Sequence, residues 1–211
     1  MDRAILRSTG VEHPSLLVVP TAADKYPSES ASNGVSYFAE LGAESSALMV
    51  LDRSHANDPD LVSATDTADV VYFTGGNPAH LLDTLKGSLL LTKIEQALER
   101  GAIVAGSSAG AMVMGPWMRF REWRQALGIA GVVTLPHHER NDPDQVAKDL
   151  ADAAPSGVPV LGIDGKTACF GGPQTWEVLG PGHVTAYQDG QWRRYSAGET
   201  LTLDSATPRE N

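Results

Sequence analysis

The sequence predicts an α/β fold in which a mostly parallel central sheet is followed by a C-terminal antiparallel appendage. Through the first two thirds of the chain, short apolar runs alternate with amphipathic segments, which is the pattern of βαβ units. Beyond residue 165, short strand-like segments follow one another and are separated by glycine-containing turns. Because 211 residues fit one compact unit, we expect a single domain over residues 1–211.

The parallel part is predicted from four apolar strands, expected at residues 15–20, 46–51, 69–73 and 102–106. A helix between the first two is indicated by apolar residues at helical spacing, namely Ala31, Val35, Phe38 and Leu41. Gly34 lies inside this helix, where glycine is unfavourable. After the third strand, Asn77 is a predicted N-cap with Pro78 at the first helical position. A further helix is expected over residues 92–100.

The C-terminal third begins with one more strand-helix-strand pattern. A strand is expected over Gly131–Leu135, a helix over Pro143–Ala153 and a strand over Val158–Ile163. Short strands then make up the predicted appendage, at residues 167–170, 175–179, 183–187, 192–195 and 199–203.

Composition excludes several functional classes. The formal net charge is −10, so nucleic acids and anionic membranes would be repelled. Cys169 is the single cysteine, which excludes an internal disulfide and a metal site built on several thiolates. The first twenty residues lack the pattern of a signal peptide or membrane span. We therefore expect a cytoplasmic protein without nucleic-acid or membrane partners.

The most informative motif is an apolar strand that runs directly into Gly-x-Ser-x-Gly. Residues 102–111 read Ala-Ile-Val-Ala-Gly-Ser-Ser-Ala-Gly-Ala, which is the context of a nucleophile elbow. Such a turn holds its serine in a strained conformation, and side chains at Gly106 and Gly110 would collide. Ser108 is the predicted nucleophile, and the amide of Ala109 can stabilise the oxyanion of a tetrahedral intermediate. The alternative is a plain glycine-rich loop.

A second glycine turn, Gly75-Gly76-Asn77-Pro78, lies one βα unit earlier in the chain. Adjacent strands would bring the two turns together, and Gly76 could then supply the second oxyanion amide. The alternative is a tight turn in which Asn77 only caps a helix.

A serine nucleophile needs a general base, and histidine is the usual one. His137 and His138 follow the strand that ends at Leu135, at the sheet edge where open α/β folds place their sites. His137 is the predicted base, while His138 is expected to pack or to contact substrate. The other histidines are expected in surface or capping roles; they are His13, His55, His80 and His183.

Two carboxylates are candidates to orient the histidine. Glu122 lies between nucleophile and base in the chain and is preferred, and Asp164 ends a predicted strand and is the alternative. Each has a non-catalytic explanation, because Glu122 could pair with Arg119 or Arg121 and Asp164 could form a turn with Gly165.

Together, these motifs resemble the aspartyl dipeptidase (peptidase E) and cyanophycinase family of serine peptidases. The resemblance includes Val18-Val-Pro-Thr-Ala22, Gly75-Gly-Asn77, Gly106-Ser-Ser-Ala-Gly-Ala111, Leu135-Pro-His137 and Gly162-Ile-Asp164. It implies the fold of class I glutamine amidotransferases, a flavodoxin-like three-layer sandwich, with serine in place of their cysteine. It also implies that Ser108 is the nucleophile, that His137 is the base, and that the amides of Gly76 and Ala109 form the oxyanion hole.

The resemblance leaves the acid and the specificity open. Aspartyl dipeptidase has its acid shortly after the nucleophile helix, which points to Glu122, whereas other members have a glutamate where this chain has Gly165. Family members also begin with an extra strand that the segment from Asp2 to Leu6 does not match, so one sheet strand fewer is expected. Their connection from serine to histidine is longer than the one from Ser108 to His137.

The expected activity is hydrolysis of a short Asp-Xaa peptide through an acyl-enzyme, without metal or cofactor. Arg119, Arg121 and Arg124 could supply local cations for the acidic substrate, or could form a solvated face. Asn77 is a further substrate-binding candidate. The alternatives are an esterase-like hydrolase and a non-catalytic binding protein. An amidotransferase is disfavoured because the elbow carries serine and Cys169 lies in a different, apolar strand. The resemblance implies a homodimer.

Overall fold

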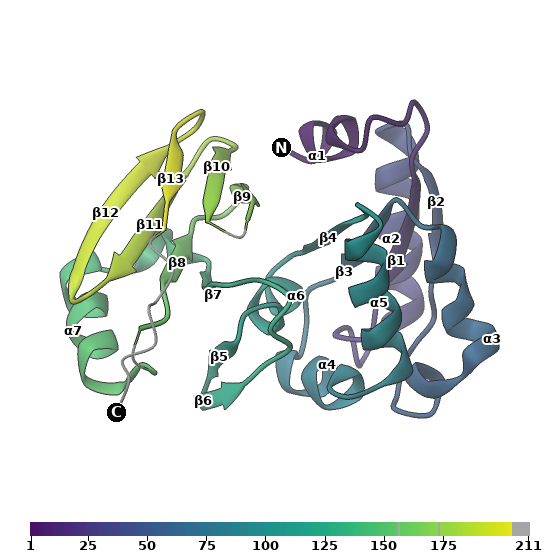
Figure 1. Cartoon of the computed structure of the whole chain (residues 1–211), viewed down its shortest axis with the longest axis horizontal. Helices are drawn as coiled ribbons and strands as arrows, with labels where there is room; N and C mark the ends of the chain where they lie inside the picture. Colours follow the sequence, from purple (N-terminus) through teal and green to yellow (C-terminus); the bar gives the residue numbers. More distant parts are fainter. Residues whose placement is uncertain (156, 173, 204–211) are drawn as a thin grey trace. The chain divides into compact units, whose positions relative to one another are not determined.

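A computed structural model describes residues 1–155, 157–172 and 174–203. The chain divides into two compact units, an N-terminal unit over Asp2–Val113 and a C-terminal unit from Met114 onward. Figure 1 shows the helices and strands of both units. Among the described residues, no helix is both long and apolar enough to cross a membrane. The expectation of a single domain over the whole chain stays a prediction.

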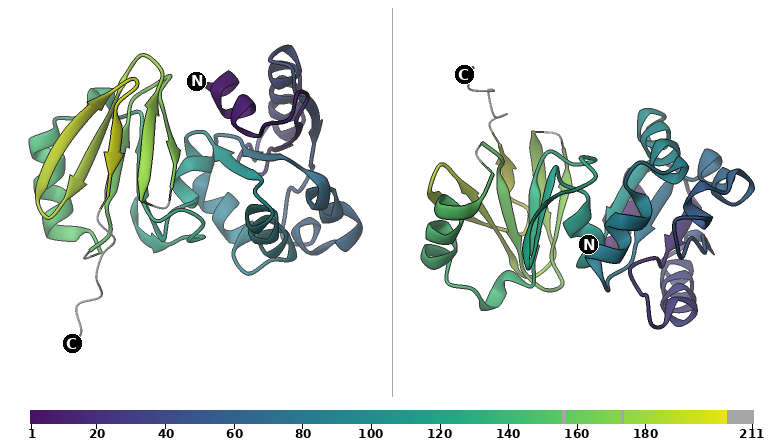
Figure 2. Two further views of the ribbon diagram at one scale, coloured as in Figure 1. Left: turned by 45° about the horizontal axis from the view of Figure 1, so that its top comes forward. Right: turned by 90° about the horizontal axis from the view of Figure 1, so that it is seen from below.

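The N-terminal unit contains a four-stranded parallel sheet in the order β2-β1-β3-β4. Its strands are β1 (Ser15–Val19), β2 (Glu44–Ala47), β3 (Val70–Phe73) and β4 (Ile103–Gly106). Helices cover both faces of this sheet (Figure 2). They are α1 (Asp2–Ser8), α2 (Pro27–Glu40), α3 (Pro59–Val62), α4 (Pro78–Leu85), α5 (Leu89–Glu99) and α6 (Ala109–Val113), with short 3-10 helices η1 (His55–Asn57) and η2 (Ser63–Thr67). The predicted parallel α/β architecture is confirmed.

Helix α2 packs on the sheet face that carries Leu16 and Val18, where Phe38 completes an apolar cluster. Gly34 has a packing reason in this helix, since a Cβ atom there would lie 2.8 Å from Cγ1 of Val18. Gly34, which is unfavourable for the helix itself, therefore allows close approach of α2 to β1. At the start of β1, the carboxylate of Asp69 accepts the backbone N–H of Ser15 at 2.8 Å.

The expected strand at 46–51 is wrong in its position, because β2 covers Glu44–Ala47. Leu48 and Val50 are buried, but they follow the strand rather than form it. The ladder ends where the amide of Leu48 bonds the carbonyl of Val18 at 2.9 Å and the chain then turns. The apolar run therefore indicated burial, and the more polar segment before it pairs with β1.

The described residues of the C-terminal unit form three sheets. The strands are β5 (Trp117–Phe120), β6 (Glu122–Gln125), β7 (Val133–Pro136), β8 (Val160–Ile163), β9 (Ala168–Gly171), β10 (Thr175–Leu179), β11 (His183–Gln188), β12 (Gln191–Ser196) and β13 (Thr200–Thr202). Strands β5 and β6 form a hairpin, β12-β11-β8-β7 form a mixed sheet, and β13-β10-β9 form an antiparallel sheet. The antiparallel C-terminal strands are confirmed, although β11 and β12 extend the sheet of β7 and β8.

Helix α7 (Pro143–Ala153) connects the parallel strands β7 and β8, as predicted. Its Asp142 N-cap accepts the amide of Asp144 at 2.9 Å. The helix packs Ala147 and Leu150 against Val133 and Val160 of the two strands. The short 3-10 helix η3 (His138–Arg140) lies between β7 and α7, and it carries the residues that follow the predicted base.

Candidate active site

The Gly-x-Ser-x-Gly motif forms a strained strand-to-helix turn, as predicted. Strand β4 ends at Gly106 and helix α6 begins at Ala109. Ser108, between them, has a φ of 47°, a left-handed conformation that costs a non-glycine residue about 1–3 kcal/mol. The carbonyl of Ser108 accepts the amide of Met112 at 3.0 Å, which joins the turn to the helix. Such strain is characteristic of functional residues.

The two glycines of the motif have the steric reason that the sequence predicted. A Cβ atom at position 106 would lie 2.6 Å from the carbonyl carbon of Gly110, and one at position 110 would lie 2.5 Å from the carbonyl oxygen of Phe73. Both obstacles are backbone atoms, so no side-chain rotation would relieve them. The elbow therefore requires glycine on either side of Ser108.

The second glycine turn lies beside the elbow, because β3 and β4 are neighbouring parallel strands. A Cβ atom at Gly75 would lie 3.3 Å from Cβ of Ser108. Gly76 has a φ of 141°, and a Cβ atom there would lie 2.1 Å from the carbonyl oxygen of Ala22. The predicted juxtaposition of the two turns is therefore confirmed within the N-terminal unit.

Asn77 ties this second turn to two parts of the unit. Its Oδ1 accepts the amides of Ala79 and His80 at 3.1 and 3.2 Å, so it caps α4 as predicted. Its Nδ2 donates to the carboxylate of Asp24 at 2.9 Å. Its backbone N–H donates to the carbonyl oxygen of Ala22 at 2.7 Å. These contacts hold the turn that contains the Gly76 amide.

His137 and His138 occupy different environments in the C-terminal unit. His137 is exposed and left-handed, with φ 57° and ψ 40°. His138 is buried, and its Nε2 shares a 2.6 Å hydrogen bond with the hydroxyl of Tyr187. Burial lowers the pKa of His138, although Asp164 opposes the shift. Gly162 faces the His138 ring, since a Cβ atom there would lie 2.4 Å from Cδ2. This contact set supports the packing role for His138.

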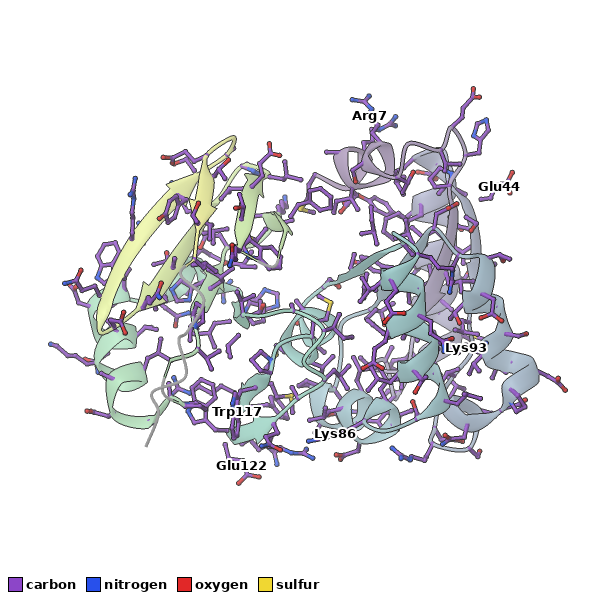
Figure 3. The ribbon with its side chains drawn as sticks, viewed as in Figure 1. Arg7, Glu44, Lys86, Lys93, Trp117 and Glu122 are labelled. Atoms are coloured by element: carbon purple, nitrogen blue, oxygen red, sulfur yellow. The ribbon has the colours of Figure 1, made fainter. Side chains whose placement is uncertain are left out.

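The two predicted acids, Glu122 and Asp164, have different surroundings. Glu122 is exposed at the first position of β6 and projects outward from the hairpin (Figure 3). Within the described residues, it forms no ion pair with Arg119 or Arg121. Asp164 accepts the backbone N–H of His183 at 2.9 Å and lies 3.4 Å from Nδ1 of the same residue. Asp164 therefore supports the start of β11.

The three candidate arginines do not share one face of the hairpin. Arg119 pairs with Trp123, and Arg124 pairs with Met118. Because successive residues of a strand alternate between faces, Arg119 and Arg124 project from opposite faces. Arg121 forms the turn at a φ of 64° and lies 5.6 Å from the centre of the Phe120 ring. Only one of the two strand arginines can therefore face a given ligand.

The other histidines make the local contacts expected of non-catalytic residues. His13 contacts the carbonyl of Gly42 at 3.2 Å, and His80 contacts that of Leu51 at 2.9 Å. His55 contacts the amide of Leu51 at 3.4 Å, while His183 lies beside Asp164. Among the described residues, no group of three or more histidine, cysteine or acidic side chains could hold a metal ion.

Cys169 is partly buried in β9, and burial raises the pKa of its thiol to about 12. A thiol that is protonated at neutral pH is a poor nucleophile. The expectation that this cysteine is unreactive is therefore supported.

Glu139 lies two residues after His137 and is not among the site residues predicted from the sequence. Its Oε2 accepts the backbone N–H of Gly165 at 2.9 Å. The only signal in the sequence was its proximity to the predicted base, because the contact with Gly165 joins segments 26 residues apart.

A serine in a strand-to-helix elbow, beside a glycine turn on the neighbouring parallel strand, is the arrangement of α/β serine hydrolases. Comparison of the sequence with known protein families identifies the family within this class. The chain belongs to peptidase family S51, whose model matches residues 1–171. The protein is therefore a peptidase of the serine type, and the resemblance drawn from its motifs is confirmed.

Known proteins similar to this chain are also peptidases by name. An uncharacterised peptidase of Pasteurella multocida is 23% identical over 186 residues, covering 81% of this chain and 87% of that protein. Peptidase E of Citrobacter koseri is 30% identical over 146 residues, covering 58% of this chain and 64% of that protein.

Two solved structures show similar folds. The crystal structure of a peptidase from an acI-B1 Actinobacterium has a TM-score of 0.76 and 28% identity, covering 96% of this chain and 89% of that one. A putative peptidase E from Listeria monocytogenes has a TM-score of 0.60 and 17% identity, with 93% of each chain covered. The second likeness concerns the fold alone.

Proposed function

We propose that this S51 peptidase hydrolyses short peptides with an N-terminal aspartate through an acyl-enzyme formed on Ser108. The observation that carries the proposal is the strained Ser108 elbow, with the Gly75-Gly76 turn packed beside it. Membership of the family supports peptide hydrolysis, and the similarity to peptidase E supports the substrate class.

In the proposed mechanism, Oγ of Ser108 attacks the scissile carbonyl carbon while His137 accepts the hydroxyl proton. The amides of Gly76 and Ala109 stabilise the resulting oxyanion. The first amide of a helix has no partner within that helix, which leaves Ala109 available. His137 then donates its proton to the leaving amine, and water hydrolyses the acyl-enzyme with His137 again acting as base. Glu122 is the proposed orienting acid, with Asp164 as the alternative.

Recognition of an acidic substrate needs local cations, because the formal charge of −10 repels anions at long range. Arg119, Arg121 and Arg124 are the proposed sources. Because Arg119 and Arg124 project from opposite faces of the hairpin, we propose that one of them contacts the substrate together with Arg121. Asn77, which is partly exposed and directly follows Gly76, is a further proposed contact.

The test compares Ser108→Ala with Ser107→Ala, its neighbour in the same turn. We expect S108A to lower kcat for Asp-Xaa dipeptides by a factor on the order of 10⁶ and to abolish labelling by a fluorophosphonate probe. S107A should retain labelling, because the Ser107 hydroxyl bonds to Tyr72 rather than serving as the nucleophile. Unchanged turnover in S108A would refute the proposal. A preference for acyl esters over dipeptides would favour the esterase alternative.

A further inference from the structure

Two loops of the N-terminal unit meet beside the Ser108 elbow. The loop after β1 contains Ala22 and Asp24, and the loop after β3 contains Gly76 and Asn77. Strands β1 and β3 are neighbours, and β1 is followed by β2 on one side of this pair whereas β3 is followed by β4 on the other. In open parallel sheets, ligands bind at the carboxyl ends of the strands where the strand order reverses. The two loops therefore lie where a ligand is expected.

Gly76 has the features of an oxyanion donor. It is exposed, and within the described part of the chain its backbone N–H has no backbone acceptor. The preceding residue packs on the elbow, since a Cβ atom at Gly75 would lie 3.3 Å from Cβ of Ser108. A donor of this kind stabilises an oxyanion only when its direction is fixed before the reaction. The contacts that fix the turn are therefore functional candidates.

Asn77 fixes the turn from its C-terminal side. Its backbone N–H donates to the carbonyl oxygen of Ala22 at 2.7 Å, which holds the peptide group before Asn77 against the loop after β1. Its Oδ1 accepts the amides of Ala79 and His80 at the start of α4. Its Nδ2 donates to Oδ2 of Asp24 at 2.9 Å. One side chain thus joins the turn to a helix and to the neighbouring loop.

The hydrogen bond to Asp24 determines which way the Asn77 carboxamide points. The amides of α4 require its oxygen, whereas a carboxylate only accepts and requires its nitrogen. If the carboxamide were turned by 180°, donors would face donors and acceptors would face acceptors. A hydrogen bond to a carboxylate is also stronger than one between neutral groups. Asp24 therefore favours the orientation in which both ends of the carboxamide are bonded.

The fold gives Asp24 no other evident task. The residue is exposed and lies in a turn outside any helix or strand. Helix α2 begins at Pro27, with Tyr26 at the N-cap position and no side-chain cap, so Asp24 does not cap it. A single hydrogen bond between exposed side chains adds little to stability. The position of Asp24 next to the Gly75-Gly76 turn is therefore its more informative property.

We propose that Asp24 is a positioning residue of the oxyanion hole: its carboxylate orients Asn77, which holds the Gly76 amide in the direction needed to donate to the oxyanion. The inference rests on the proposed function of Ser108. All of these residues belong to the N-terminal unit, so the arrangement is complete within that unit.

The test removes, weakens and then reverses the hydrogen bond. Asp24→Ala removes the acceptor, and Asp24→Asn keeps an oxygen that can accept. Asn77→Asp keeps the oxygen that caps α4 but places two carboxylates together. The double variant D24N/N77D restores the hydrogen bond with donor and acceptor exchanged. The measurement is fluorophosphonate labelling of Ser108, separated into the maximal rate and the probe concentration that gives half of it.

We expect the maximal rate to fall about 3- to 100-fold in D24A and in N77D, because a misdirected amide loses part of its stabilisation of the transition state. The half-saturating concentration should change less than about twofold, since binding of the probe precedes formation of the oxyanion. D24N should lose less than D24A. The double variant should recover most of the rate that N77D loses, because the two substitutions are coupled.

Asp58→Ala is the matched control. Asp58 caps α3 of the same unit by accepting two amides, at 3.0 and 3.3 Å, so its loss destabilises the unit without changing either loop. Its maximal labelling rate should equal that of the wild type. If D24A slows labelling no more than D58A, the inference is wrong. A direct contact of Asn77 with the probe, without any role of Asp24, would give this result.

The exchanged pair decides the matter should D24A fail to fold. Failure of D24N/N77D to label faster than N77D would contradict the inference while leaving the proposed function intact. The proposed function has its own readout, because the wild-type protein must label and S108A must not. If the wild type does not label, the proposed function is overturned and the inference with it.

Discussion

Gly76→Ala tests whether the Gly75-Gly76 turn depends on close approach of two backbone segments. The substitution has two costs, because Gly76 has a φ of 141° and its Cβ atom would lie 2.1 Å from the carbonyl oxygen of Ala22. Gly42 is a matched control in the same unit, with a φ of 103° and nothing within 4 Å of its Cβ position. Gly42→Ala therefore includes backbone strain alone, which costs about 1–3 kcal/mol.

The expected difference between the two variants follows from the overlap with Ala22. Overpacking that forces backbone movement costs a further ~1–3 kcal/mol, so G76A should lower the free energy of unfolding by that much more than G42A. Urea unfolding followed by far-UV circular dichroism measures both values. G76A should also slow fluorophosphonate labelling of Ser108 under conditions where the variant is folded, whereas G42A should not. Equal destabilisation by the two substitutions would refute the steric argument.

Two further predictions follow from buried titratable groups. Burial raises the pKa of Cys169 to about 12, so only about one thiol in ten thousand is ionised at pH 8. A disulfide reagent should therefore react slowly with Cys169 in the native protein and rapidly in denaturant. Fast reaction of the native protein would contradict the burial of this thiol. Because burial lowers the pKa of His138, the unfolded chain takes up a proton below about pH 6.5 that the folded chain resists. The free energy of unfolding should therefore decrease as the pH falls from 7 to 5, and this decrease should be smaller in His138→Asn. If the free energy of unfolding depends on pH equally in both proteins, the lowered pKa of His138 is refuted.

Much of the N-terminal unit could be predicted because local chemistry determines it. Asn77 and Pro78 mark the start of α4 by side-chain capping and a preset φ, and both signals depend on adjacent residues only. The elbow could be predicted for a related reason, since Gly106 and Gly110 lie so close to neighbouring backbone that no other residue fits. The motif itself indicated Ser108 as the nucleophile, and the family resemblance added support for His137 over His138 as the base.

The missed features depend on contacts between distant segments. The hairpin of β5 and β6 follows the elbow helix, and its pairing of Trp117 with Gln125 was not indicated by apolar alternation. The contact of Glu139 with Gly165 is an example, because the parallel pairing of β7 and β8 brings the two residues together. Chain order and the family resemblance favoured Glu122, and neither criterion contains information on distances in the folded chain.

The division of the chain at Val113 has a practical consequence for spectroscopy. All four tryptophans lie beyond that point, at residues 117, 123, 176 and 192. Indole emission therefore reports only on the unit that carries His137 and is silent about the one that carries Ser108. A substitution such as G76A that changed the emission maximum would reveal a disturbance transmitted out of its own unit, whereas an unchanged spectrum beside a reduced dichroism signal would locate the damage to the parallel sheet.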